Sequence, residues 1–238
     1  MKLSKLYNIL NINILLILCV VVSLLCGSRK SFAVASSKTP SVVELTGKTG
    51  ASINARLLLN VCKQNGIPLS SVYQWKNHLV IYGNLPDTVK LLKQIKARYP
   101  ACSIKSYSRP FYNFNRKYCN NQTEAKDWEN IILTANLVAD PKMQQEYLQY
   151  HATQFQKWPE VSNGFCHANF QQLLVFENGR QLMLVISIPK GESLDKLNPK
   201  TTENNPRVDE WNAMMKKYQT GIPGTKKNEV WVFFKPVG

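Results

Sequence analysis

A histidine inside an aromatic segment is the first candidate for chemistry in this chain. His151 lies in the stretch EYLQYHATQFQKWPE, residues 146–160, four residues after Tyr147 and one after Tyr150. Residues three or four apart share one face of a helix, so a helix here would place Tyr147 beside the imidazole. Histidine can act as an acid or a base near neutral pH. The alternative is the buried stripe of an amphipathic helix, with a packed, hydrogen-bonded histidine.

Two other features could serve a ligand. His167, in GFCHANF, could be a partner acid or base, although a surface loop histidine is the simpler interpretation. Residues 107–118, YSRPFYNFNRKY, interleave basic and aromatic side chains, which is a composition that stacks sugars or single-stranded nucleic acid. Pro110 interrupts this segment and favours an edge strand or a connector that packs on the second half of the chain.

The elements that must position these residues follow the same order twice. The first half predicts a strand at 41–47, a helix at 51–66, a hairpin at 70–84, a helix at 85–100 and a strand at 101–108. The second predicts the corresponding elements at 130–138, 140–155, 170–188, 205–219 and 229–235. Each order is βαββαβ, so we expect an α+β fold of tandem ferredoxin-like units, at 40–118 and 125–238, whose sheets face each other.

The first 35 residues predict export. Lys2 and Lys5 precede the apolar run ILLILCVVVSLLC and the cleavage-like FAVAS, the pattern of a signal peptide. Lipidation at Cys26 ranks second, and a retained membrane anchor third. Removal of these residues lowers the net charge from +15 to +11, because they carry four basic residues and no acid. That charge suits an anionic membrane surface or an acidic glycan, whereas scattered lysines and export disfavour nucleic acid; a solvated basic surface is the simplest alternative.

The mature chain would keep four cysteines, Cys62, Cys102, Cys119 and Cys166. None has a CxxC spacing, which argues against a zinc site. An oxidising compartment would permit disulfides, and we expect at most one, with buried free thiols as the alternative.

Several motifs of the second half, taken together, point to one family. EYLQYH, WPEV, LLVFENGRQLMLVI, NPRVDEW and EVWVFF occur in an order that resembles the L-rhamnose mutarotase family over about residues 129–236. Members of that family fold as dimeric α+β barrels and interconvert sugar anomers without a metal or cofactor. The resemblance does not extend to the first half.

The resemblance also implies roles for individual residues. The family's catalytic histidine, in the pattern Tyr-x-x-x-His, falls on His151, with Tyr147 as a sugar or imidazole contact. Trp158 and Trp211 match tryptophans of the family that could cover the apolar face of a deoxy sugar, while Trp158-Pro159 could equally form a structural corner. Leu173 and Phe176 replace tyrosines found in many members, so hydroxyl donors are missing.

These features predict an exported isomerase acting on a free sugar, with His151 as general acid/base and with Tyr147, Trp211, Trp158 and His167 as substrate contacts. No metal or cofactor is expected. A homodimer or an internal pseudo-dimer would complete the fold, and the N-terminal segment could hold the protein at a membrane. The alternative is a noncatalytic carbohydrate-binding module on the same scaffold, which a His151 sealed beneath Phe155 and Trp211, rather than placed in an open cavity, would favour. A third possibility, a purely structural pseudo-dimer, predicts no cavity.

Overall fold

The computed structural model describes residues 39–48 and 52–238. The predicted signal segment at 1–35 and Cys26 lie outside the described residues. The described chain is an α+β fold with two antiparallel sheets, as the sequence predicted, and Thr39–Gly238 form one compact unit. None of the helices described is both long enough and apolar enough to cross a bilayer.

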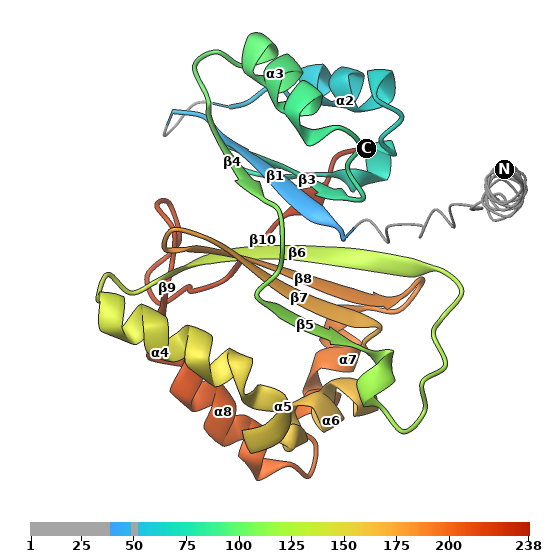
Figure 1. Ribbon diagram of the computed structural model, residues 1–238, viewed down its shortest axis with the longest axis vertical. Helices are drawn as coiled ribbons and strands as arrows, with labels where there is room; N and C mark the ends of the chain where they lie inside the picture. The colour runs from blue at the N-terminus through green and yellow to red at the C-terminus, as the bar shows by residue number, and fades with distance from the viewer. Residues whose placement is uncertain (1–38, 49–51) are drawn as a thin grey trace, which may run out of the picture. The chain divides into compact units, whose positions relative to one another are not determined.

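The first sheet has the strand order β11-β2-β3-β1-β4. Its strands are β1 (Ser41–Thr46), β2 (Val72–Trp75), β3 (His78–Gly83), β4 (Ser103–Tyr107) and β11 (Lys235–Pro236). Helices α2 (Ala55–Gln64) and α3 (Thr88–Arg98) cover one face of this sheet and bury apolar side chains against it, among them Leu58 and Ile95. Figure 1 shows both helices on the side of this sheet that faces away from the second sheet.

The second sheet has the order β10-β6-β8-β7-β5, with β9 paired to β6. Its strands are β5 (Tyr112–Asn115), β6 (Trp128–Leu137), β7 (Gln172–Asn178), β8 (Gln181–Pro189), β9 (Gln219–Thr220) and β10 (Val232–Phe233). The helices on its outer side are α4 (Pro141–Ala152), α5 (Gln154–Lys157), α6 (Pro159–His167), α7 (Leu194–Leu197) and α8 (Pro206–Lys216). Short 3-10 turns complete the described chain at Leu69–Ser71, Arg116–Tyr118 and Asn198–Thr201.

The inner faces of the two sheets meet in an apolar layer. Val80 and Tyr107 of the first sheet lie in one buried cluster with Phe176 and Met183 of the second. Side chains alternate along a strand, so Leu174 and Phe176 of β7 enter this layer while Leu173 and Val175 face the helices. Each sheet therefore has one face under helices and one under the other sheet, and neither exposes a broad apolar surface.

Two segments pair with the sheet that is built mainly from the other half of the chain. β5, within the aromatic segment 107–118, pairs with β7 of the second sheet, as the connector interpretation of Pro110 anticipated. β11, at the end of the chain, pairs with β2 of the first sheet. The expected strand at 229–235 is correspondingly wrong in length, because only Val232–Phe233 pair with β6 before the chain crosses to the other sheet. The chain thus passes from the first sheet to the second between β4 and β5, before residue 112. The division into domains near residues 118–128 stays a prediction.

Proline begins both long helices of the second half. The Asp140 side chain accepts hydrogen bonds from the backbone N–H groups of Lys142 and Met143, as an N-cap should. Asn205 occupies the same position before α8, but its side chain makes no cap; its Nδ2 donates instead to the carbonyl of Glu160. A capping side chain is therefore present at the start of α4 and absent at the start of α8.

The hairpin between β7 and β8 turns through Gly179 and Arg180, because Asn178 pairs with Gln181. Gly179 has a φ of 59°, which favours glycine at the turn.

One disulfide, Cys119–Cys166, is present among the described residues, which confirms the expectation of at most one. It joins the 3-10 turn after β5 to α6. Cys62 is buried and free, and burial raises the pKa of its thiol to about 11.

Candidate functional site

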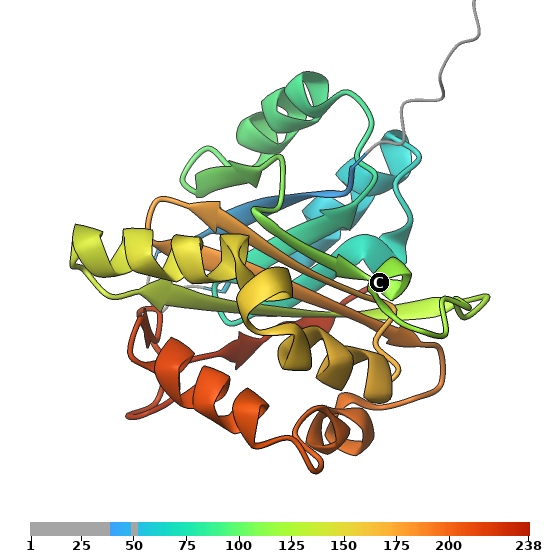
Figure 2. The same cartoon turned by 60° about the horizontal axis from the view of Figure 1, so that its bottom comes forward.

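A cavity of about 320 Å³ lies between the helices and the outer face of the second sheet. α4 contributes Tyr147 and His151 to its wall, and α8 contributes Trp211. Tyr112 of β5, Gln219 of β9, Asn198 and Asn212 add further polar groups to the wall. The structure thus brings three of the predicted site residues, Tyr147, His151 and Trp211, into one cavity (Figure 2 shows α4 and α8 over the same sheet).

His151 lies in an aromatic enclosure and is only 8% exposed. Its ring centroid is 4.3 Å from that of Tyr147, 5.3 Å from Tyr112 and 5.3 Å from Trp211. Phe111 adds an edge-on contact at 5.6 Å. The rings exclude most of the solvent around the imidazole and hold it in one orientation.

The hydrogen bond of His151 fixes its tautomer. Nδ1 lies 3.0 Å from the backbone carbonyl of Tyr147, one helical turn earlier. A carbonyl only accepts, so Nδ1 carries the proton in the neutral ring and the lone pair is on Nε2. Nε2 has no hydrogen-bond partner among residues 39–48 and 52–238. Burial lowers the pKa of His151 to about 4, so the imidazole is neutral at neutral pH and Nε2 can accept a proton.

The Tyr147 hydroxyl is held at the wall of the same cavity. It accepts a 3.3 Å hydrogen bond from Gln219 Nε2, and Gln219 Oε1 accepts one of 3.1 Å from Trp231 Nε1. Burial raises the pKa of Tyr147, so the hydroxyl keeps its proton. A protonated phenol beside a neutral imidazole pairs a donor with an acceptor.

Two predicted site residues lie elsewhere. Trp158 is outside the cavity wall; its ring stands 5.7 Å from Trp211 and 3.8 Å below the Arg207 guanidinium. It ends α5 and precedes Pro159, the first residue of α6, as the structural-corner interpretation anticipated. His167 is exposed and pairs with Glu203 at 3.1 Å beside a different cavity. The structure does not bring His167 to His151.

Residues 115–237 match the L-rhamnose mutarotase family. The chain belongs to the L-rhamnose mutarotase family. The match begins earlier than the motifs of the second half, at the end of β5, and contains His151, Tyr147 and Trp211. We call residues 115–237 the mutarotase-family region.

Two curated relatives match part of this chain, and one of them is a mutarotase. An L-fucose mutarotase from Xanthomonas campestris pv. campestris is 25% identical over 104 residues, which cover 43% of this chain and 81% of the relative. A UPF0734 protein from Dictyostelium discoideum is 25% identical over 112 residues, covering 47% of this chain and 86% of that protein.

Two solved structures align with most of the chain. A putative monooxygenase from Fusobacterium nucleatum has a TM-score of 0.44 and 9% identity, covering 84% of this chain and 92% of that one. A heme-degrading enzyme from Listeria monocytogenes has a TM-score of 0.37 and 10% identity, covering 83% and 99%.

The cavity around His151 has an apolar wall where the second sheet lines it. Leu173 and Val175 of β7 line it, whereas Phe176 points to the other sheet. Of the two positions where the resemblance led us to expect tyrosine, Leu173 and Phe176, only Leu173 lies at this cavity. Within the described ranges, no Asp, Glu, Lys or Arg side chain lines it, and no cluster of three potential metal ligands occurs.

Sequence reasoning did not single out Tyr112 or Gln219 as site residues. Tyr112 reaches the cavity because β5 pairs with β7, and its hydroxyl donates to Gln154 Oε1 at 2.6 Å. Tyr112 precedes the family match, which begins at residue 115, so the aromatic composition of residues 107–118 was the only signal in the sequence. Gln219 is positioned by the two-residue strand β9, which no periodicity predicts.

The buried histidine of the mutarotase-family region predicts acid sensitivity of the fold. The unfolded chain takes up a proton on His151 near its ordinary pKa of 6.5, but the folded protein does so only near 4. The protonation of His151 therefore does not lower the free energy of unfolding above about pH 6.5. As the pH drops from 6.5 toward 4, it lowers that free energy by about 3 kcal/mol in total. Urea unfolding at pH 7 and pH 4.5 measures this loss.

A matched pair of variants isolates the effect. His151→Gln should unfold with a smaller difference between pH 7 and pH 4.5 than the native protein. His167→Gln should keep the native difference, because His167 is exposed in an ion pair that contributes little. Equal pH dependence in the native protein and in His151→Gln would contradict the assignment.

Proposed function

We propose that this protein is a mutarotase that interconverts the anomers of a small free sugar, an isomerase reaction, in the cavity around His151. The observation that supports it most is the placement of the Tyr-x-x-x-His pair: Tyr147 and His151 share one wall of a cavity inside the mutarotase-family region. L-fucose and L-rhamnose are the first substrates to consider, because the family and one relative carry their names.

The proposed mechanism uses one base and one acid. His151 Nε2 takes the proton of the anomeric hydroxyl as the bond between the anomeric carbon and the ring oxygen breaks, and the Tyr147 hydroxyl protonates the ring oxygen. The open-chain aldehyde rotates about its first carbon–carbon bond and the ring closes on the other face. The two proton transfers then run in reverse, so that the side chains return to their starting states.

The aromatic enclosure suits a sugar with an apolar face. Trp211 stands at the wall beside His151, and an indole ring can cover the C–H face of a pyranose. Mutarotation already proceeds in water, so acid/base catalysis of about 10²–10⁴-fold accounts for a useful rate.

The proposal also includes the way in which the two sheets are built and paired. In both sheets the strand order matches that of a ferredoxin-like unit, with β4-β1-β3-β2 in one and β10-β6-β8-β7 in the other. We propose that they form an internal pair of the dimeric α/β-barrel type, in which the first unit covers the sheet of the second. Export through residues 1–35, and domain limits at 40–118 and 125–238, are part of this proposal.

A second candidate is a noncatalytic binding module. It is favoured by the apolar sheet wall, where Leu173, Val175, Leu184 and Ile186 offer a sugar no hydrogen bonds. Such a module would bind a ligand with an apolar face without exchanging its anomers.

Anomer exchange distinguishes the two functions. Saturation-transfer NMR of L-rhamnose and L-fucose near pH 7 measures how fast magnetisation passes between the α and β signals. Exchange faster than in buffer supports the mutarotase. Exchange at the buffer rate for both sugars, together with saturable binding of either one, would favour the binding module.

A further inference from the structure

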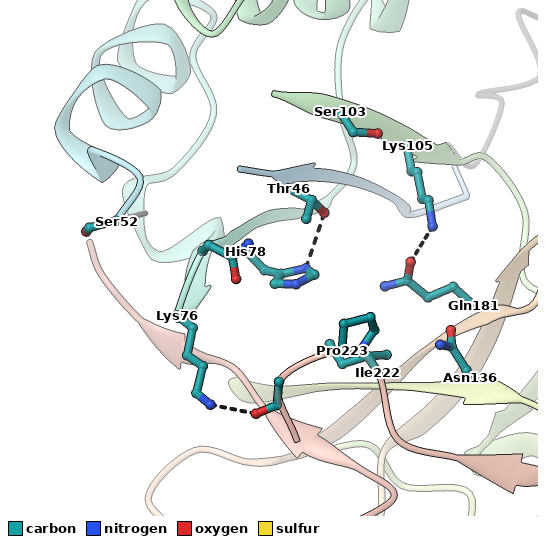
Figure 3. Close-up of a pocket in the computed structure, with 12 residues that line it drawn as sticks. Thr46, Ser52, Lys76, His78, Ser103, Lys105, Asn136, Gln181, Ile222 and Pro223 are labelled. Atoms are coloured by element: carbon teal, nitrogen blue, oxygen red, sulfur yellow. Dashed lines mark hydrogen bonds between the residues drawn. The ribbon is translucent and has the colours of Figure 1, made fainter. Parts of the chain in front are cut away.

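A second cavity, larger than the first, opens where the two sheets meet. Its volume is about 760 Å³, and the cavity around His151 shares none of its lining residues. The first sheet contributes Thr46, His78 and Lys105, and the second contributes Asn136 and Gln181. Figure 3 shows the His78, Lys105 and Gln181 side chains pointing into the same space.

A buried carboxylate lies behind this wall and fixes its polar groups. Glu44 is fully buried, and its two oxygens accept hydrogen bonds from Tyr107 Oη at 2.9 Å, Gln181 Nε2 at 2.9 Å and His78 Nδ1 at 2.8 Å. Because an ionised carboxylate only accepts, His78 Nδ1 carries a proton. Its Nε2 has no hydrogen-bond partner in the described part of the chain.

Gln181 links this carboxylate to a cation. Its Nε2 donates to Glu44 and to Thr134 Oγ1, while its Oε1 accepts from Lys105 Nζ. With every polar atom of the amide engaged, the Lys105 ammonium is held at a fixed place on the wall. The site is thus arranged before any ligand enters, which lowers the entropic cost of binding.

The cavity wall carries positive charge and no carboxylate. Lys76 Nζ donates to the carbonyl of Gly224 at 2.6 Å, and Lys105 donates to Gln181. An ammonium group has three donors, so each lysine keeps others for a ligand. Neither lysine forms an ion pair within the described ranges, and no Asp or Glu among the described residues lines the cavity.

We propose that this cavity binds an anionic saccharide, with a uronate as the simplest form. Lys105 binds its negative group, and Lys76, on the opposite side of the cavity in Figure 3, adds positive potential, since cations in a cavity whose lining contains no acid favour an anion. The hydroxyls of Thr46 and Ser103 and the amide of Asn136 pair with sugar hydroxyls, which both donate and accept. The volume suits a ligand of one or two sugar units. This site gives the first half of the chain a binding role and does not depend on the mutarotase proposal.

Titration calorimetry with methyl glycosides tests the proposal. Methyl α-D-galactopyranosiduronate has no free anomeric hydroxyl, so it is not a mutarotase substrate, and the lysine variants of this cavity show where it binds. We expect it to bind at least about tenfold more tightly than the uncharged methyl α-D-galactopyranoside, and less tightly as salt rises from about 0.05 to 0.5 M. Equal affinity for the two glycosides, or no binding of either, would overturn the proposal.

Lysine variants locate the binding. Lys105→Met and Lys76→Met keep the aliphatic stems and remove the charge, and each should weaken uronate binding about tenfold. Lys93→Met removes an exposed charge of α3 and should leave it unchanged. Native melting temperatures show that the variants fold. Unchanged binding in both cavity variants would overturn the proposal, as would competition by inorganic sulfate at the same concentration as the uronate, which indicates a simple anion site.

Discussion

Replacement of His151 by alanine is expected to remove the acceleration of anomer exchange, by about 10²–10⁴-fold relative to the native protein. The reason is the loss of Nε2, which is the proton acceptor of His151. Nε2 is free to accept because Nδ1 carries the ring proton and donates it to the carbonyl of Tyr147. His151→Gln fills more of the space and should be equally inactive, because an amide oxygen is too weak a base. Saturation-transfer NMR with L-fucose and L-rhamnose measures both variants.

Two controls make this result specific. His167→Ala should keep native exchange, because His167 is exposed and pairs with Glu203 beside another cavity. Tyr147→Phe should retain part of the acceleration, because water can replace the phenol as acid while the base remains. Native exchange in His151→Ala would exclude this histidine as the base.

The burial of His151 determines how the rate of anomer exchange depends on pH. With the pKa of His151 lowered to about 4, the neutral base predominates above about pH 5. Exchange catalysed by the protein should therefore be level between about pH 5 and 8, after subtraction of the buffer rate, and should fall as the pH drops through 4. A fall centred near 6.5 would instead indicate a solvated histidine.

Loss of the Cys119–Cys166 disulfide is expected to lower the free energy of unfolding by about 4 kcal/mol, because it closes a loop of 47 residues in the unfolded chain. The bond also ties the turn after β5 to α6, so it holds two walls of the His151 cavity. Urea unfolding of a Cys119→Ala, Cys166→Ala double variant measures the loss.

Cys102→Ala provides the matched control, since Cys102 is a free, half-buried cysteine. It should change stability by less than about 1 kcal/mol. Reducing agent should destabilise the native protein and leave the double variant unaffected. Equal stability of the native and double-variant proteins would show that the bond does not constrain the chain in solution.

The sequence by itself determined the local elements and the identity of the family. Apolar periodicity predicted most of the helices and strands, because each element must bury one face and its period is set by backbone geometry. Asp140 and Pro141 mark the start of α4 in the sequence, since a capping carboxylate and a proline act within four residues. The four-residue spacing of Tyr147 and His151 predicted their contact for the same reason, because it lies within one helical turn.

The tertiary structure alone decided what surrounds these residues. Tyr112 enters the His151 cavity through the pairing of β5 with β7, and Gln219 through that of β9 with β6. Glu44 and Gln181 meet across 137 residues of sequence, and no local pattern encodes that contact. His167 is close to His151 in sequence and could act as an acid or a base. It lies at the end of α6, however, where its side chain is exposed to solvent. Helical and strand periods act over a few residues, whereas the pairing and stacking of sheets depend on contacts distant in the chain, so the cavities could be seen only in the folded protein.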